Sequence, residues 1–287
     1  MSASTATFTI LGADGFIGGA LVAWLESEER VVHAITRAAL PALLASRRPA
    51  GHVIDCIGLG GDVQERPLEL AEAHVGLVAR CLAQLRFESF LLLSSTRVYG
   101  QDGAAHEDAV LSATPADPSG LYEVTKLAGE ALCLADPCRT TRVARLPDVY
   151  GIRMPAWTFL GRLLREGRAN GSVVFRESAV SSRDYVSVAA VVRLLTLIAT
   201  AGRSRIYNVA SGHNTSHAEI AECLYTIAGW HTEFAPSAPV VRQPPIDTTR
   251  LETEFGSATS NLLGDLPGLL ASAWKGQDRD QQGLPAA

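Results

Sequence analysis

The chain has 287 residues and a mass of 30.5 kDa, and 47% of its residues are hydrophobic while 19% are charged. That much apolar surface excludes a disordered chain, and a net charge of −5 without a basic stripe excludes a nucleic-acid groove. The sequence contains no run of 18 apolar residues and no signal-peptide pattern. We therefore expect no membrane association and a cytoplasmic protein.

The cysteines predict free thiols. Their number is odd, and their spacing is not that of a zinc site or a disulfide framework. We expect a reducing compartment and no metal site. The five are Cys56, Cys81, Cys133, Cys138 and Cys223.

Strands and helices are predicted to alternate through the first half of the chain. Expected strands are 7–11, 31–36, 52–57, 90–94 and 142–146, with helices at 16–28, 67–85 and 122–134 and a loop at 101–120. This alternation with apolar strands indicates an α/β fold, a doubly wound parallel sheet covered on both faces. The residues between the second and third strands fit only a helix or a loop. The edge strand beyond the second is therefore expected to be missing.

The second half is less regular. Expected elements are helices at 157–166, 187–200 and 218–227 and strands at 172–175 and 206–209. Residues after 236 are expected to be rich in loops, with a loose tail at 277–282. We expect residues 1–151 plus 184–212 to form a dinucleotide-binding domain. Residues 152–183 plus 213–287 are expected to form a smaller substrate-binding lid over the strand ends.

A glycine-rich turn follows the first strand and opens the first helix. Gly12 allows the tight turn, Gly15 lets the backbone approach a pyrophosphate, and Gly18 lets the helix pack closely on the strand. A turn of this kind between a strand and a helix predicts a dinucleotide cofactor. Asp14, Phe16 and Ile17 belong to the same expected contact surface.

The end of the second strand indicates which dinucleotide is bound. Thr36 and Arg37 stand where a carboxylate would hold the adenosine ribose. Because a guanidinium can bind a 2'-phosphate, NADP is the preferred cofactor and NAD the alternative. Further expected cofactor contacts are Cys56, Ile57, Gly58, Ser94, Leu146 and Val149.

Candidate catalytic residues lie on one helix and at one strand end. Tyr122 and Lys126 are four residues apart, so they share a helix face. Ser94, Ser95 and Thr96 end a strand, and strand carboxyl ends are where open α/β sheets bind ligands.

With these motifs in order, the chain resembles the extended short-chain dehydrogenases/reductases, the nucleotide-sugar epimerase, dehydratase and reductase type. The resemblance covers nearly the whole sequence and implies a Rossmann fold. It rests on the glycine-rich turn, 94–100 (Ser-Ser-x-x-Val-Tyr-Gly), Tyr122-x-x-x-Lys126, 145–151, 183–186, 207–212 and 247–256.

The resemblance implies a role for each candidate. Tyr122 would be the acid/base that moves a proton to or from the sugar oxygen, and Lys126 would stabilise its phenolate form and bind the nicotinamide ribose. Ser95 would hydrogen-bond the reacting oxygen. Ser95, Thr96, Asp148 and Arg183 would contact the substrate, Arg183 at its diphosphate or, alternatively, in a structural pair with Asp184. The resemblance also implies a homodimer through helices 67–85 and 122–134.

Departures from the family pattern narrow the reaction. Related dehydratases carry an acid one or two places after the catalytic serine or threonine, but these places hold Thr96 and Arg97, so 4,6-dehydration is not expected. His74 replaces a family asparagine near a proton relay, and is expected either to relay a proton or to be a satisfied core histidine. Asp148 replaces another asparagine, and its carboxylate would repel a diphosphate unless it binds hydroxyls.

The predicted function is therefore NAD(P)-dependent reduction of a keto-sugar nucleotide by hydride transfer, with Tyr122 as acid/base. One alternative is an NAD-retaining nucleotide-sugar epimerase. An alternative of another class is a non-catalytic dinucleotide-binding or sensing protein on the same fold.

Overall fold

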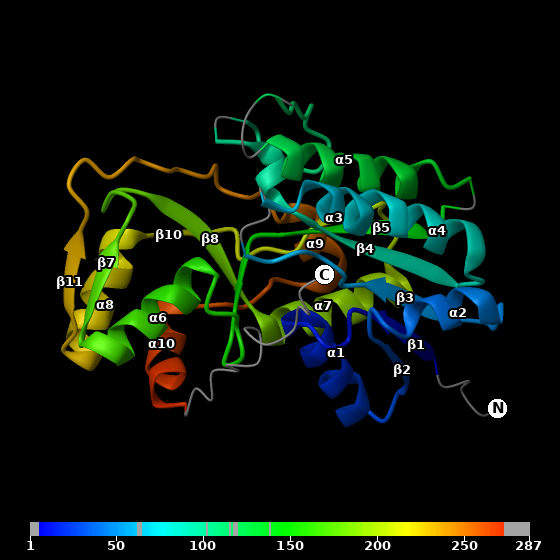
Figure 1. The fold of residues 1–287 in the computed structure, drawn as a ribbon, viewed down its shortest axis with the longest axis horizontal. Helices are drawn as coiled ribbons and strands as arrows, with labels where there is room; N and C mark the ends of the chain where they lie inside the picture. The colour runs from blue at the N-terminus through cyan, green and yellow to red at the C-terminus, as the bar shows by residue number, and fades with distance from the viewer. Residues whose placement is uncertain are drawn as a thin grey trace.

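A computed structural model describes residues 6–61, 65–101, 103–114, 116, 120–137 and 139–272. Two groups of elements lie side by side along the long axis of the molecule (Figure 1). One is built on a six-stranded sheet, and the other is smaller. Cys138 and the expected tail at 277–282 lie outside the described residues.

The six-stranded sheet is parallel throughout and has the order β2-β1-β3-β4-β5-β9. Among the described residues β2 is an edge strand, and helix α2 (Leu40–Ser46) occupies the gap after it, where a helix or a loop was expected. The carboxyl ends of the strands meet at one edge, where Leu11 pairs with Ile35 and with Asp55. The strands are β1 (Thr7–Leu11), β2 (Val31–Ile35), β3 (His52–Asp55), β4 (Ser89–Ser95), β5 (Thr141–Leu146) and β9 (Ile206–Asn208).

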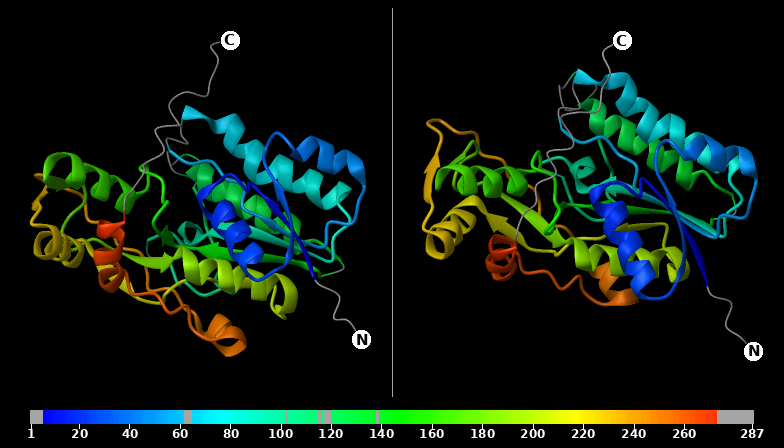
Figure 2. Two further views of the ribbon diagram at one scale, coloured as in Figure 1. Left: turned by 90° about the horizontal axis from the view of Figure 1, so that it is seen from below. Right: turned by 60° about the horizontal axis from the view of Figure 1, so that its bottom comes forward.

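Helices cover both faces of this sheet, which confirms the doubly wound prediction (Figures 1 and 2). On one face lie α1 (Phe16–Ser27) and α7 (Val188–Ala201). On the other lie α5 (Gly120–Leu134) and one long helical stretch beside it. That stretch consists of α3 (Pro67–Ala71), the π-helix η2 (Glu72–Gly76) and α4 (Leu77–Gln84).

The smaller group of elements has an apolar core of its own. Val173, Phe175, Leu163, Leu224 and Leu266 are at its centre. Its members are α6 (Phe159–Asn170), β7 (Ser172–Phe175), α8 (His217–Ala228), β11 (His231–Phe234) and α10 (Leu262–Ala271). Strands β7 and β11 form a two-stranded sheet. Three short strands, β6 (Asp148–Tyr150), β8 (Ser182–Ser187) and β10 (Asn214–Ser216), form a separate three-stranded sheet. The expected division at 151, 184 and 212 stays a prediction.

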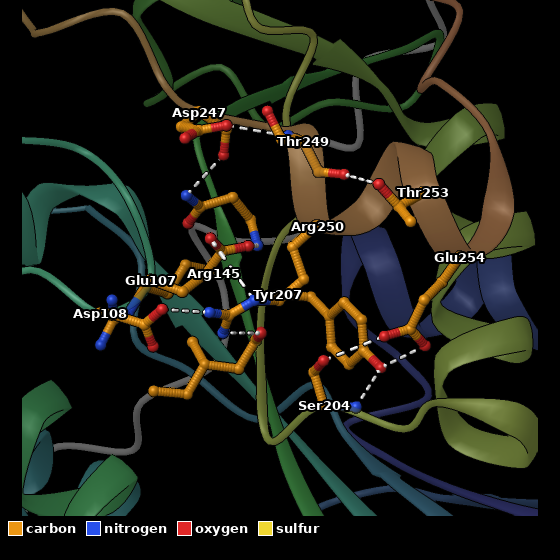
Figure 3. A network of polar contacts seen from close by, with 12 residues as sticks. Glu107, Asp108, Arg145, Ser204, Tyr207, Asp247, Thr249, Arg250, Thr253 and Glu254 are labelled. Carbon is orange, nitrogen blue, oxygen red and sulfur yellow. Dashed lines mark hydrogen bonds and ion pairs between the residues drawn. The ribbon is translucent and has the colours of Figure 1, made fainter.

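The segment after residue 236 contains two helices where mainly loop was expected. Helix α9 (Thr249–Phe255) is tied to β9 by polar contacts (Figure 3). Glu254 accepts a 2.8 Å hydrogen bond from the Tyr207 hydroxyl, and Arg250 donates to the Ile206 carbonyl over 3.1 Å. Because these contacts join residues that are far apart in the sequence, tertiary structure positions this helix, and no local periodic pattern predicts it.

Candidate active site

The glycine-rich turn has the backbone shape that a dinucleotide phosphate requires. Gly12 has φ +73°, and its N–H donates to the Ile35 carbonyl over 2.9 Å. A Cβ on Gly18 would lie 2.1 Å from the Gly12 oxygen. Gly15 is the N-cap of α1 and no side chain caps this helix, which leaves first-turn amides for an anion. These residues fit a dinucleotide.

Arg37 lies beside this turn. It comes two residues after Ile35, whose carbonyl accepts from the N–H groups of both Gly12 and Ala13, and its side chain is exposed at the edge of the sheet. Such a guanidinium could meet a 2'-phosphate without displacing another contact. The preference for NADP stays a prediction.

The three hydroxyl residues at the end of β4 differ in their surroundings. Ser94 is buried and donates to Glu130 Oε1 over 2.5 Å. Ser95 is half-buried, and its Oγ accepts from the Arg97 N–H over 3.2 Å, beginning the short 3-10 helix η3 (Thr96–Tyr99). Thr96 is buried. Of the three, Ser95 is the one whose hydroxyl lies at the open edge of the sheet.

Tyr122 and Lys126 lie together on the first two turns of α5. The Lys126 Nζ is 5.9 Å from the centre of the Tyr122 ring and donates to the Leu93 carbonyl over 3.0 Å. Lys126 is only 7% exposed. Its ammonium is therefore fixed between the end of β4 and the tyrosine.

His74 packs its ring edge against Tyr122, with 5.4 Å between the ring centres. Thr125 Oγ1 donates to the Tyr122 carbonyl and lies 2.9 Å from His74 Nδ1, so we assign the proton to Nδ1. His74 Nε2 is buried and has no hydrogen-bond partner among the described residues. Burial, and secondarily the charge of Lys126, lowers the pKa of His74 to about 3, so the ring is neutral at pH 7. One His74 nitrogen is thus hydrogen-bonded and the other has no partner among the described residues, and the choice between a proton relay and a core histidine stays a prediction.

Arg97 lies over the face of Tyr122, a contact that the sequence did not predict. Its guanidinium carbon is 4.4 Å from the ring centre, and Nη2 is 2.8 Å from Glu123 Oε1. The Arg97 side chain is 44% exposed. A cation therefore occupies the position at which the resemblance implies an acid in dehydratases.

Arg183 is held by two carboxylates. Its Nη1 lies 3.5 Å from Asp148 Oδ2 and its Nη2 lies 2.5 Å from Glu177 Oε2, and its side chain is only 13% exposed. The Arg183–Asp184 pair weighed from sequence is not formed, because Asp184 accepts instead from the backbone N–H groups of Ser211 and Gly212. Glu177 could not be recognised from sequence, since nothing local marks it as a partner of Arg183. A diphosphate would have to compete with both acids.

Asp55 is a further group that the sequence did not reveal. It ends β3, is 0% exposed, and its Oδ1 accepts from the Ile57 N–H over 3.0 Å. Burial raises the pKa of Asp55 to about 6, although the Ile57 hydrogen bond and Lys126 both act to lower it. Cys56 and Ile57, expected at the cofactor, follow this carboxylate directly.

Within the described residues no helix is long and apolar enough to cross a membrane, and no group of three or more histidine, cysteine or acidic side chains is placed to hold a metal ion.

The sequence of the chain matches a profile of a known protein family. A profile of the NAD dependent epimerase/dehydratase family matches residues 8–210. No curated protein is matched by sequence.

Solved structures match over most of the chain. MoeE5 in complex with UDP-glucose and NAD is 25% identical with a TM-score of 0.76, over 92% of this chain and 97% of MoeE5. Two others share the fold at lower identity. UDP-glucose 4-epimerase of Thermotoga maritima with UDP-glucose is 18% identical (TM-score 0.77, 92% and 96% covered). RMD of Pseudomonas aeruginosa complexed with NADPH is 22% identical (TM-score 0.75, 93% and 96% covered).

Proposed function

The chain belongs to the NAD dependent epimerase/dehydratase family, and from this premise we propose that it reduces a keto-sugar nucleotide with NADPH. The observation that carries the proposal is the position of Tyr122, beside the buried ammonium of Lys126 and near the carboxyl end of β4. MoeE5, the UDP-glucose 4-epimerase and RMD support a nucleotide sugar and a nicotinamide cofactor by analogy.

In this proposal each side chain has a defined task. Ser95 donates a hydrogen bond to the substrate carbonyl, and Tyr122 gives its phenolic proton to the same oxygen as the carbonyl becomes an alcohol. Lys126, fixed by the Leu93 carbonyl, stabilises the phenolate that remains. The bound nicotinamide would supply the hydride.

Reduction is favoured over dehydration by the residues after Ser95. Neither Thr96 nor Arg97 is a carboxylic acid, so neither can protonate a leaving hydroxyl as an acid would. The exposed Arg37 beside the glycine-rich turn supports NADPH as the reductant.

The test is a parallel titration of cofactor-free protein with NADPH and NADH, followed by turnover of keto-sugar nucleotides. We expect NADPH to bind at least about tenfold more tightly, a margin that Arg37→Ala removes. Tyr122→Phe should lower kcat by about 10²- to 10⁴-fold while NADPH still binds. Tyr225→Phe, at a tyrosine that is 64% exposed on α8, is the matched control and should change nothing.

Other outcomes would contradict the proposal. If NADH binds as well as NADPH and UDP-glucose is epimerised without net reduction, the protein is an NAD-retaining epimerase. If neither dinucleotide binds, it is a non-catalytic protein on this fold.

A further inference from the structure

Of the three basic side chains near Tyr122 and the expected substrate site, Lys126, Arg183 and Arg97, Arg97 is the one most exposed to a ligand. The ammonium of Lys126 is buried against the Leu93 carbonyl. The guanidinium of Arg183 is paired with two carboxylates and is 13% exposed. Arg97 is 44% exposed, and among the described residues its one ion pair is through Nη2 to Glu123.

The ion pair with Glu123 engages one Nη group of Arg97, and stacking on Tyr122 uses the face of the guanidinium rather than its N–H donors. A guanidinium carries five N–H donors in a planar fork, and one of its two Nη groups is engaged here. Glu123 lies on α5 next to Tyr122 and its side chain is 16% exposed, so it fixes the cation from the helix side. The remaining donors can form the paired hydrogen bonds that a carboxylate accepts.

The position of Arg97 limits which substrate group it could meet. Its guanidinium carbon is 4.4 Å from the centre of the Tyr122 ring, and a phenol that transfers a proton must lie within about 3 Å of the reacting oxygen. A group bound by Arg97 can therefore belong to the same sugar ring as the reacting carbon.

Resting on the function proposed above, we propose that Arg97 binds a carboxylate carried by the reacting sugar. The substrate class is then a uronic acid, with the acid group close to the carbon that gains or loses hydride. Glu123 orients Arg97, and Tyr122, whose ring both Arg97 and Lys126 approach, is the proton donor. Arg97 is thus a specificity-determining residue.

The role of Arg97 is tested by isothermal titration calorimetry, in which two pairs of ligands are titrated into the NADPH-loaded protein. The first pair is UDP-glucuronate and UDP-glucose, and the second is glucuronate and glucose without a nucleotide. We expect the carboxylate member to bind about 10- to 100-fold more tightly, as charge-assisted hydrogen bonds imply. Arg97→Gln should abolish this ratio, and Arg97→Lys should retain part of it.

Arg80→Gln is the matched control, because Arg80 on α4 is 45% exposed and also carries one ion pair, to Glu72. It should leave the ratio unchanged, and thermal unfolding of every variant confirms folding. Equal binding within both pairs, including no binding at all, overturns the inference. The inference is also overturned if Arg97→Gln weakens the binding of UDP-glucuronate, UDP-glucose and UDP equally. Arg97 would then bind the diphosphate and not a carboxylate. A glucuronate preference that persists when no UDP-sugar binds would uphold the inference and reject the nucleotide-sugar proposal.

Discussion

Two buried groups near Lys126, Asp55 and His74, have pKa values that are shifted in opposite directions. Burial disfavours the charged form of each, so it raises the pKa of Asp55 to about 6 and lowers the pKa of His74 to about 3. At pH 7 Asp55 is ionised and His74 is neutral. The ammonium that is to stabilise the Tyr122 phenolate therefore has one buried carboxylate nearby and no competing imidazolium.

The shifted pKa of Asp55 predicts a pH dependence of stability. Its folded-state pKa lies above its ordinary value of 3.8, so the unfolded carboxyl ionises first as the pH rises. The free energy of unfolding should fall by up to about 3 kcal/mol between pH 4 and 6 through this group. Asp55→Asn keeps an oxygen for the Ile57 N–H but cannot ionise, so this group should not lower its free energy of unfolding as the pH rises. The difference in free energy of unfolding between the variant and the wild type, measured by urea unfolding, should therefore grow by this amount from pH 4 to pH 6. Parallel curves from pH 4 to 7 would refute the assignment.

The catalytic candidates could be predicted from sequence because each motif is local. Ser95, Tyr122 and Lys126 are specified by their spacing within one strand end and one helix turn. The partners that tune them could not be predicted. Glu177 and Arg183 are only six residues apart, but the shape of the segment between β7 and β8 decides their pairing, and Arg97 reaches Tyr122 across the gap between η3 and α5.

The same distinction holds for secondary structure. The parallel strands have apolar runs that identify them one by one, and all six were predicted to within about two residues. Strands β7 and β11 pair in register although they are far apart in the sequence, and β11 was not predicted. Helix α10 contains Pro267, which argues against a helix locally, but Asn261 caps its first turn by accepting from Gly264. Strand pairing of this kind is fixed by the tertiary fold, whereas the Asn261 cap is a local signal that was missed in the sequence.

The turn between β1 and α1 tolerates no side chain at its last glycine. A Cβ at Gly18 would lie 2.1 Å from the Gly12 oxygen, so Gly18→Ala must push the helix away from the strand. We expect a loss of about 1–3 kcal/mol in the free energy of unfolding and a marked loss of NADPH affinity. Gly268→Ala on α10, where a Cβ meets nothing within 4 Å, is the control and should be neutral or slightly stabilising. Unchanged NADPH titration in Gly18→Ala would show that the tight packing is not required.

At the scale of the whole molecule, the outer side of α5 is unusual in carrying no charge over most of its length. Between Val124 and Leu134 the charged side chains are Lys126 and Glu130, and both are buried. Glu130 is turned inward to pair with Arg145. Leu127 and Ala128 are partly exposed, Ala131 is exposed, and all three are apolar. Helix α4 packs beside α5 on the same face of the sheet (Figures 1 and 2). A long uncharged surface of small and aliphatic residues is typical of a subunit interface.

We therefore predict a homodimer through α4 and α5, with an interface that a single charge disrupts. Light scattering of the eluted protein should give twice the chain mass of 30.5 kDa for the wild type. Ala131→Glu places a carboxylate at the exposed centre of this surface, where its desolvation in a dimer costs several kcal/mol, so the variant should elute at the monomer mass. Tyr225→Glu adds the same charge on α8, far from this face, and should leave the mass unchanged. A wild-type protein of monomer mass, or an Ala131→Glu variant that still dimerises, would mean that the uncharged side of α5 has another purpose.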